Sequence, residues 1–356
     1  MKFNLADICE YVKGKVDVAI LDEHTYISTE NMVPNKGGII KASSLPTIAQ
    51  TQAFLTGDVL VSNIRPYFKK IWFAEFDGGC SNDVLVFRAK DGVSRRFLYY
   101  VLADDTFFDY SMATSKGTKM PRGDKTAIMK YAVPYFTYEE QETIAGILYV
   151  LDRKIQLNTE INENLLQQAQ AIYHDTFIAN AKPTWPLGHL SDLITVRYGK
   201  DHKKLADGIY PVYGSGGIMR YVERPLYNKE SVLIPRKGTL NNVMYVNEPF
   251  WSVDTMFFTE MKLPNVAKFV FHFVKSKDLA SLNAGSAVPS MTTDILNAME
   301  LSIPDTNAFN KFESIVAPMY QAMQQNTKES SKLAELRDSL LPKLMSGELD
   351  ISSLDL

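Results

Sequence analysis

Residues 151–172 read LDRKIQLNTEINENLLQQAQAI. Apolar and small side chains recur here in alternating steps of four and three residues, which is the spacing of a coiled-coil stripe on an α-helix. Thr137 and Glu140 have the spacing of a capping box that would begin this helix. We therefore predict a helix from about residue 137 to residue 179, and its stripe consists of Ile144, Leu148, Leu151, Ile155, Asn158, Asn162, Leu165, Ala169 and Ile172.

A second segment near the end of the chain repeats this pattern. Asn158-Thr159 and Asn326-Thr327 are separated by an offset of 168 residues, and Leu165 and Leu333 match at the same offset, so the two helices are repeated in register. The paired asparagines can fix the register of two packed helices, or they are exposed positions on an imperfect stripe. The second stripe consists of Phe312, Val316, Met319, Met323, Asn326, Ser330, Leu333, Arg337, Leu340 and Leu344.

The segments that precede the two helices also correspond. Short blocks recur in the same order, and Gly117-Thr118-Lys119-Met120-Pro121 matches Gly285-Ser286-Ala287-Val288-Pro289, again at 168 residues. Short β-rich runs bounded by Gly, Asn and Pro predict a mixed α/β module in each half. The other matching blocks are residues 5–8 with 190–193, 58–61 with 231–234, and 96–100 with 268–272.

The order of these segments predicts an α+β fold with two mixed α/β domains in tandem, each followed by a long helix. The first helix leads into the second module and the second helix leads out of it, so helices that pack together must be antiparallel. A helix of about 40 residues is roughly 60 Å long, so the coiled coil would hold the modules apart. The predicted parts are residues 1–138, the first module; 139–182, the first helix; 183–305, the second module; and 306–356, the second helix and tail.

The composition is typical of folded soluble domains. The chain has 356 residues, of which 46% are hydrophobic and 22% charged. No apolar run approaches the ~20 residues that cross a bilayer, and the first residues lack a basic segment followed by an apolar one. We therefore expect a cytoplasmic protein. Cys9 and Cys80 lie far apart without a CxxC partner, so we predict packed thiols.

Charge is distributed unevenly along a chain whose formal net charge is −3. Residues 1–138 have 17 Lys and Arg against 15 Asp and Glu, and residues 183–305 have 13 against 12, so the modules carry +2 and +1. Residues 139–182 carry −4 and residues 306–356 carry −2. The long helices therefore hold the acidity.

Basic residues gather in the modules beside aromatic residues and glycines. Such clusters suit phosphate neutralisation and contacts to base edges, although each cluster alone is also typical of a solvated surface. Net charge by itself indicates DNA binding only weakly. The clusters contain Arg65, Lys69 and Lys70; Lys116, Lys119, Arg122 and Lys125; Lys200, Lys203 and Lys204; and Arg236 with Lys237.

Motifs for catalysis were not found. The sequence has no P-loop, no His-Glu-x-x-His and no Gly-x-Ser-x-Gly. The five histidines are scattered without metal-ligand spacing, so no metal site is predicted. Gly214-Ser215-Gly216-Gly217 lacks the order of a dinucleotide-binding loop, so we predict a turn there.

Two longer segments and three short motifs together resemble the DNA-specificity subunit of type I restriction-modification systems, and the resemblance covers nearly the whole chain. The second helix departs from the family pattern because it begins Asn310-Lys311-Phe312 without a Glu-Gln pair, and Gly117-Thr118 stands in place of Gly-Ser. The segments that carry the resemblance are residues 151–170 and 336–348, Tyr210 to Gly217, the turn from Gly285 to Pro289, and Glu140-Gln141.

The resemblance implies a non-catalytic subunit that reads a bipartite, asymmetric double-stranded DNA target, with one half-site for each target-recognition domain. The helices would set the gap between the half-sites. Two modification subunits would bind this subunit and methylate adenine with S-adenosylmethionine, and motor-endonuclease subunits could join them. No cofactor is expected in this chain. The basic clusters would line the DNA face, with residues 116–125 and 199–204 as the preferred readers.

Two other functions remain open at the level of sequence. A coiled-coil adaptor that binds proteins, without a role on DNA, is favoured by the weak net basicity of the modules. A self-contained methyltransferase is disfavoured by the absent motifs, including the Asn-Pro-Pro-Tyr tetrapeptide of adenine methyltransferases. Binding of duplex DNA that weakens steeply with salt would separate the first of these from the specificity subunit.

Overall fold

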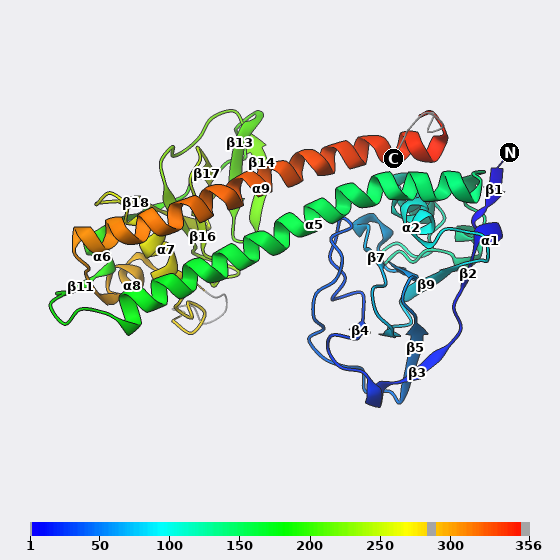
Figure 1. Cartoon of the computed structure of the whole chain (residues 1–356), viewed down its shortest axis with the longest axis horizontal. Coiled ribbons are helices and arrows are strands. Elements are labelled where there is room, and N and C mark those ends of the chain that lie inside the picture. The colour runs from blue at the N-terminus through cyan, green and yellow to red at the C-terminus, as the bar shows by residue number, and fades with distance from the viewer. Residues whose placement is uncertain (1, 283–289, 350–356) are drawn as a thin grey trace. The chain divides into compact units, whose positions relative to one another are not determined.

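The computed structural model describes residues 2–282 and 290–349 (Figure 1). The chain divides into two compact units: unit 1 comprises residues 1–158 and 327–356, and unit 2 comprises residues 159–326. Each unit therefore contains one module and one half of each long helix. The predicted turn from Gly285 to Pro289 lies outside the described residues.

Unit 1 is built from a module of short strands and helices. Its elements are β1 (Lys2–Asn4), α1 (Leu5–Ile8), β2 (Cys9–Tyr11), β3 (Lys15–Asp17), η1 (Val18–Ile20), β4 (Tyr26–Ile27), β5 (Gln50–Phe54), β6 (Val59–Ser62), η2 (Pro66–Phe68), β7 (Ile71–Phe73), β8 (Gly78–Cys80), β9 (Val84–Ala89), α2 (Arg95–Ala103), α3 (Asp105–Ala113), α4 (Lys125–Ile128) and β10 (Ala132–Pro134).

The strands of unit 1 form two four-stranded sheets, in the orders β2-β9-β6-β7 and β3-β5-β8-β4, and β1 pairs with β10. One face of the β2-β9-β6-β7 sheet and the helices α2 and α3 share a core that includes Val61, Phe87, Phe97 and Phe107. The other face shares a second core with the other sheet, around Phe54 and Trp72. Both faces of the first sheet are therefore covered, as its continuous apolar strand β6 predicts.

Unit 2 has a module of the same kind. Its elements are η3 (Asp175–Ala179), β11 (Leu187–His189), α6 (Leu190–Leu193), β12 (Ile194–Tyr198), β13 (Asp207–Gly214), β14 (Gly217–Val222), β15 (Ser231–Pro235), β16 (Met244–Val246), β17 (Trp251–Ser252), β18 (Met256–Met261), α7 (Ala267–Lys275), α8 (Thr293–Asn297) and β19 (Glu300–Ser302).

One sheet and one strand pair of unit 2 repeat those of unit 1, whereas its other sheet has three strands, in the order β14-β13-β17, against four in unit 1. The order β12-β18-β15-β16 corresponds to β2-β9-β6-β7, and the pair β11-β19 corresponds to β1-β10. Three of the four blocks matched in the sequence fall on equivalent elements, α1 with α6, β6 with β15, and α2 with α7, and the fourth includes residues 285–289, outside the described residues. The predicted tandem repeat of mixed α/β modules is confirmed. The hairpin β13–β14 also confirms the predicted turn at Gly214 to Gly217.

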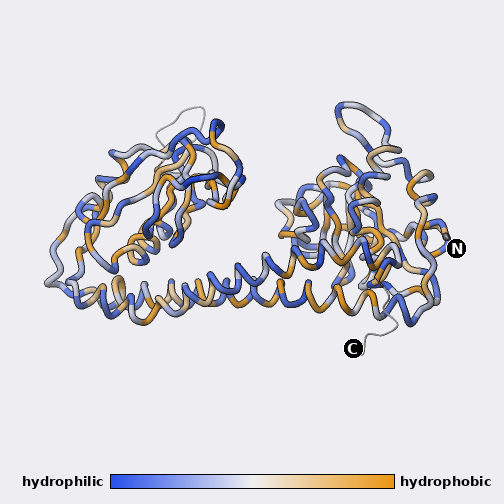
Figure 2. The backbone as a smooth tube through the Cα atoms, turned by 90° about the horizontal axis from the view of Figure 1, so that it is seen from above, coloured by the Kyte–Doolittle hydropathy of each residue, from blue (hydrophilic) through white to orange (hydrophobic). Residues whose placement is uncertain are grey.

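Two long helices, α5 (Tyr138–His174) and α9 (Thr306–Ser346), contribute to both cores. In unit 1 the first half of α5 and the second half of α9 pack on the module; in unit 2 the halves are exchanged. The helices are therefore antiparallel within each unit, as predicted. In Figure 2 both helices alternate between hydrophobic and hydrophilic colours along their length, as one apolar stripe requires.

The starts of the two helices are capped differently. Glu140 N donates to Thr137 Oγ1 (3.3 Å) and Thr137 N donates to Glu140 Oε2 (2.7 Å), which confirms the predicted capping box. The second helix begins at Thr306 and not at Asn310, because Asp305 accepts a hydrogen bond from Ala308 N at 2.8 Å. The helix thus begins at the first residue of the segment 306–356, and Asn310-Lys311-Phe312, the beginning used in the comparison with the family pattern, lies one turn inside it.

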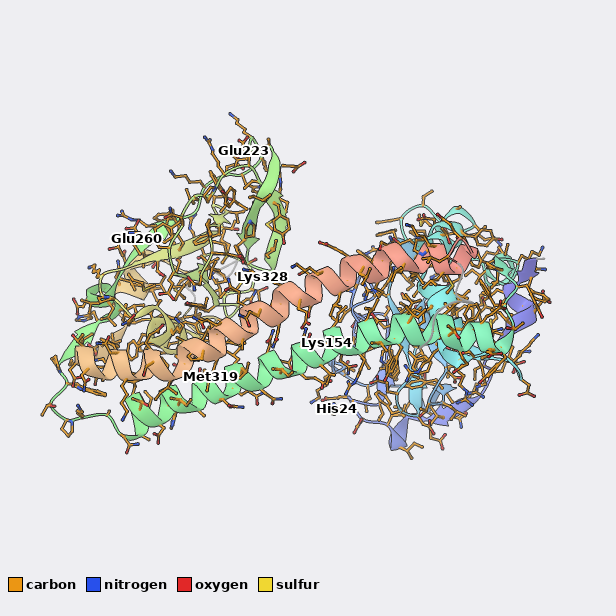
Figure 3. The ribbon with its side chains drawn as sticks, turned by 45° about the horizontal axis from the view of Figure 1, so that its top comes forward. His24, Lys154, Glu223, Glu260, Met319 and Lys328 are labelled. Carbon is orange, nitrogen blue, oxygen red and sulfur yellow. The ribbon has the colours of Figure 1, made fainter. Side chains whose placement is uncertain are left out.

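Every residue of the two predicted stripes is buried or half-buried. In unit 1, Asn158 Nδ2 donates to Glu329 Oε2 (2.8 Å) and to Ser330 Oγ (3.2 Å). In unit 2, Asn326 Nδ2 donates to Asn162 Oδ1 (2.9 Å), and Met319 packs against the core from α9 (Figure 3). The stripe positions are Leu151, Ile155, Asn158, Asn162, Leu165, Met323, Asn326, Leu333 and Leu340, together with those named above.

Candidate nucleic-acid interface

Two basic clusters of unit 1, far apart in the sequence, lie on adjacent loops. Residues 63–70 follow β6, and residues 115–125 follow α3. Arg65 N donates to Pro121 O (2.8 Å), and Ile64 and Arg122 form an isolated antiparallel bridge. The structure therefore brings Arg65, Lys69 and Lys70 next to the loop that contains Lys116, Lys119, Arg122 and Lys125.

The loop of residues 115–125 carries cations in solvent-exposed ion pairs. Lys116 Nζ lies 2.6 Å from Asp124, but its side chain is 81% exposed, and Arg122 lies 3.2 Å from Asp83. The Lys116 ammonium and the amides of Ala127 and Thr126 hold the pKa of the Asp124 carboxyl below its usual value. Exposed pairs of this kind stabilise a fold little, so both cations can turn to a phosphate at low cost. Lys119 and Lys125 are exposed.

The cations of residues 63–70 have different roles. Lys69 Nζ contacts Asp105 at 2.8 Å, and Lys36, which the sequence analysis missed, contacts the same carboxyl at 2.9 Å. Partial burial raises the pKa of Asp105, but the hydrogen bonds from Lys69 and Lys36 outweigh this effect and lower it. Lys70 Nζ donates to Thr29 O (2.6 Å), and burial lowers its pKa. Lys36, Lys69 and Lys70 thus anchor the loop, and Arg65 remains exposed.

In unit 2 the two predicted clusters also converge. The Arg236 guanidinium lies over the ring of Tyr198, 5.3 Å from its centroid, so the residues after β15 lie beside those after β12. Trp251 Nε1 donates to Lys200 O (2.8 Å), which fixes the start of that second loop. Exposed cations Lys200, Lys203, Lys204 and Lys237 extend from these two loops.

The tip of the hairpin β13–β14 joins this surface, which the sequence did not reveal. Asn242 Nδ2 donates to Ser215 O (2.8 Å), and a Cβ on Gly238 would lie 2.8 Å from Ser215 Oγ. Position 238 requires glycine for two reasons: its φ of +85° lies in the left-handed region, and a Cβ there would be too close to Ser215 Oγ. The following strand exposes Ile218, Met219 and Tyr221.

One loop of each candidate surface, the loop after β6 or β15, occupies an equivalent place in the repeat, whereas residues 199–204 follow β12, the counterpart of β2. The bridge Ile64–Arg122 in unit 1 corresponds to the bridge Lys237–Ser290 in unit 2. In both units the loop after the central strand bridges to a residue shortly before the last short helix, Arg122 before α4 and Ser290 before α8. The side chains on the loops differ, so the two surfaces have a similar backbone framework but would make different contacts with a ligand.

Other candidate chemistry gives no site among the described residues. No group of three His, Cys, Asp or Glu residues within them could hold a metal ion. Burial raises the pKa of both the Cys9 and the Cys80 thiol to about 12, and both are free and packed, as predicted. No helix in residues 2–282 and 290–349 has the length and apolarity to cross a membrane.

A family model described as the type I restriction modification DNA specificity domain matches residues 1–167 and 183–334, one match for each half of the repeat. The chain belongs to this family. It is a type I restriction-modification DNA specificity subunit with two target-recognition domains, and its role is recognition and not catalysis. A subunit of this kind works in a complex with other subunits and DNA.

Named relatives support the same family. The MjaIX specificity subunit of Methanocaldococcus jannaschii is 23% identical over 309 residues, which cover 74% of this chain and 71% of the relative. The HindI specificity subunit of Haemophilus influenzae is 21% identical, and the match covers 98% of this chain and 99% of the relative. The crystal structure of an S subunit from M. genitalium shares the fold, with a TM-score of 0.60 at 19% identity over 99% of this chain and 96% of that one.

Proposed function

We propose that each unit of this specificity subunit reads one half-site of a bipartite, asymmetric DNA target through the loops described above. The observation that carries this proposal is the equivalence of the Ile64–Arg122 and Lys237–Ser290 bridges. They place one basic loop of each module, the loop after β6 or β15, at the same point of the repeat with different side chains. A duplicated scaffold with divergent loops suits two half-sites of different sequence.

Phosphate contacts are assigned to the exposed cations, which hold no structural position that binding would disrupt. Counterion release then predicts that affinity falls steeply with salt. The predicted DNA-facing residues remain Arg65, Lys69, Lys70, Lys116, Lys119, Arg122, Lys125, Lys200, Lys203, Lys204, Arg236 and Lys237, with Lys69 and Lys70 in supporting roles.

The partners are proposed to be two modification subunits, which bind S-adenosylmethionine and methylate adenine, and motor-endonuclease subunits for restriction. The cytoplasm is the proposed location, since cellular DNA is the target. We assign the modification subunits to the acidic long helices, whose first segment, residues 139–182, has three Lys and Arg against seven Asp and Glu. Glu163 is exposed on α5. Loss of copurification in Glu163→Lys would support this assignment, and unchanged copurification would contradict it.

Base-resolution mapping of adenine methylation, in cells with and without this chain, tests the proposed function. We expect methylation at one bipartite motif only when the chain is present. Purified complex should also bind the cognate duplex more tightly than a scrambled duplex in fluorescence anisotropy, with a steep salt dependence. An adaptor without a DNA role would give neither the motif nor a preference between the duplexes.

A further inference from the structure

Unit 1 presents two aromatic rings at the tip of the loop after β6. Tyr67 is 50% exposed and Phe68 is 36% exposed, and their ring centroids are 4.7 Å apart. Exposed large apolar side chains are common singly, but two adjacent rings on one tight turn form a small apolar surface. Neither ring belongs to a hydrophobic core formed by the described residues of unit 1.

The backbone beneath the rings is held in an unusual conformation. Arg65 (φ 51°) and Lys69 (φ 50°), which flank η2, adopt the left-handed conformation. Asn35 (φ 56°) and Lys36 (φ 61°), on the neighbouring turn, adopt it as well. These are four of the five non-glycine residues with positive φ in the described part of the chain. Such conformations cost free energy and cluster at binding sites.

The two turns are fastened to each other and to α3. Asn35 N donates to Phe68 O and Lys36 N donates to Lys69 O, both at 2.8 Å. Lys36 and Lys69 then share the carboxyl of Asp105. The rings therefore stand on a rigid support, which limits the entropy lost when they bind a ligand.

The surroundings of the rings are strongly basic. Residues 35–38, 63–70 and 115–125 contain eight Lys and Arg and one Asp, and the paired carboxyls of Asp83 and Asp105 bring the net charge to +5. An apolar protein partner would gain nothing from this charge, whereas a polyanion would.

Unit 2 has no counterpart of the rings. Its equivalent loop, residues 236–243, reads RKGTLNNV, and Gly238 takes the left-handed position that Arg65 has in unit 1. Leu240 is 2% exposed and belongs to the core. The aromatic tip is therefore specific to one unit.

We propose that Tyr67 and Phe68 read thymine in the half-site recognised by unit 1, through contact of their rings with the C5-methyl group. The proposal rests on the proposed function, since it assigns a base to that surface. The thymine methyl is the apolar group that an intact duplex displays in its major groove, and aromatic side chains contact it there. A ring pair on a rigid basic support matches this chemistry.

A chemical double-mutant cycle tests the proposal in the purified complex with the modification subunits. Each thymine of both half-sites is replaced in turn by uracil, which removes the methyl group and keeps the base pairing. For the wild-type complex we expect a five- to tenfold loss of affinity at one or more thymines of a single half-site. For the Tyr67→Ala/Phe68→Ala complex we expect weaker binding of the thymine duplex and no further loss with uracil there.

Tyr135→Ala is the matched control, because Tyr135 is 52% exposed after β10, outside the long helices, and should keep the wild-type response to uracil. Tyr67→Phe retains the ring and should also keep that response. The proposal is overturned if uracil weakens the double variant as much as the wild type, or if no thymine is sensitive. It is also overturned if 2-aminopurine fluorescence shows that the rings insert between bases. If the wild-type complex itself shows no sequence preference, the proposed function fails instead.

Discussion

Asn326 donates a hydrogen bond from Nδ2 to Oδ1 of Asn162, and the repeat contains its image in the bond from Asn158 to Ser330. Both pairs are related by the offset of 168 residues: Asn158 matches Asn326, and Asn162 matches Ser330. In unit 1 the carboxylate of Glu329 also accepts a hydrogen bond from Asn158, so the asparagine interaction is stronger in unit 1 than in unit 2.

This difference predicts unequal effects of the same substitution. Asn158→Ala should lower the free energy of unfolding by about 2 kcal/mol, because Asn158 is 1% exposed and its bond to Glu329 is charge-assisted. Asn326→Ala should cost about 1 kcal/mol, because Asn326 is half-buried. Urea unfolding measures both, and the exposed neighbour Gln325→Ala should change nothing. Equal losses in the two asparagine variants would contradict the prediction.

A buried histidine should make unit 2 sensitive to acid. His272 is buried, its Nδ1 lies 2.7 Å from Gln170 Oε1 and its Nε2 lies 3.0 Å from Tyr320 Oη. Burial, with a smaller effect of Lys275, lowers its pKa from 6.5 to about 4. The unfolded chain therefore takes up a proton at a higher pH than the folded chain. Stability should be full above pH 6.5 and fall by on the order of 3 kcal/mol as the pH falls to about 4.

Unfolding by urea between pH 7 and pH 4 measures this loss. His272→Gln should remove most of it, since glutamine does not titrate in this range. His24→Gln is the control, because His24 is exposed in unit 1 (Figure 3) and should leave the pH profile as in the wild type. An unchanged profile in His272→Gln would show that another group is responsible.

A buried lysine joins α7 to α9 in unit 2. Lys268 is 3% exposed, and its Nζ contacts Glu313 at 2.6 Å and Glu230 at 3.0 Å. Lys268→Met should destabilise the unit by about 3–5 kcal/mol, because two carboxylates lose their shared cation. Thermal unfolding tests this prediction. Adding Glu230→Gln and Glu313→Gln should restore much of the stability, and no restoration would argue against an electrostatic cause.

Single cations on the proposed interface should control DNA affinity. Arg122→Ala in unit 1 and Lys204→Ala in unit 2 should each weaken binding of the cognate duplex and lower the salt slope by about one. Anisotropy titrations of the complex over a salt series measure both quantities. Controls are Arg95→Ala and Lys229→Ala, which remove cations near the opposite ends of β6 and β15. Wild-type affinity and methylation in both interface variants would refute the assignment of these loops.

The helices should set the spacer of the target. Insertion of seven residues after Asn158 and seven after Asn326 keeps the stripe in phase and lengthens each helix by about 10 Å. Because base pairs rise by about 3.4 Å, the methylated motif should gain about three base pairs between unchanged half-sites. Methylation mapping reads this directly. The same motif with the original spacer would contradict the role of the helices.

The helices and the repeat could be predicted because their periodic pattern of apolar residues extends over many residues. A stripe of alternating steps over some thirty residues, repeated at one offset, leaves few alternatives to an antiparallel pair. The match between residues 5–8 and 190–193 was also confirmed, as α1 and α6, because a local capping pattern determines both short helices. Asn310-Lys311-Phe312 lies one turn inside α9, because Asp305 provides the cap without the acidic partner that marks a capping box.

Much of the candidate interface could not be predicted from local sequence. Lys36 stands alone in its segment, and only the fold brings it to the carboxyl that Lys69 also uses. The left-handed conformation of Arg65 gives no sequence signal, because arginine has no preference for it. Ser215 at the tip of β13–β14 and Gly238 after β15 belong to different sheets, so their contact is set by the fold and not by neighbouring residues.

Unit 2 is one uninterrupted segment, residues 159–326, whereas unit 1 is closed by α9 residues that follow it. During synthesis from the N-terminus, unit 2 therefore has all its parts on hand before unit 1 receives Leu341, Leu344 and Met345, which complete its core. A chain that stops just after Asn326, midway along α9, would carry all residues of unit 2 and an open core in unit 1. The module of unit 1 is therefore synthesised first, but its core is completed last.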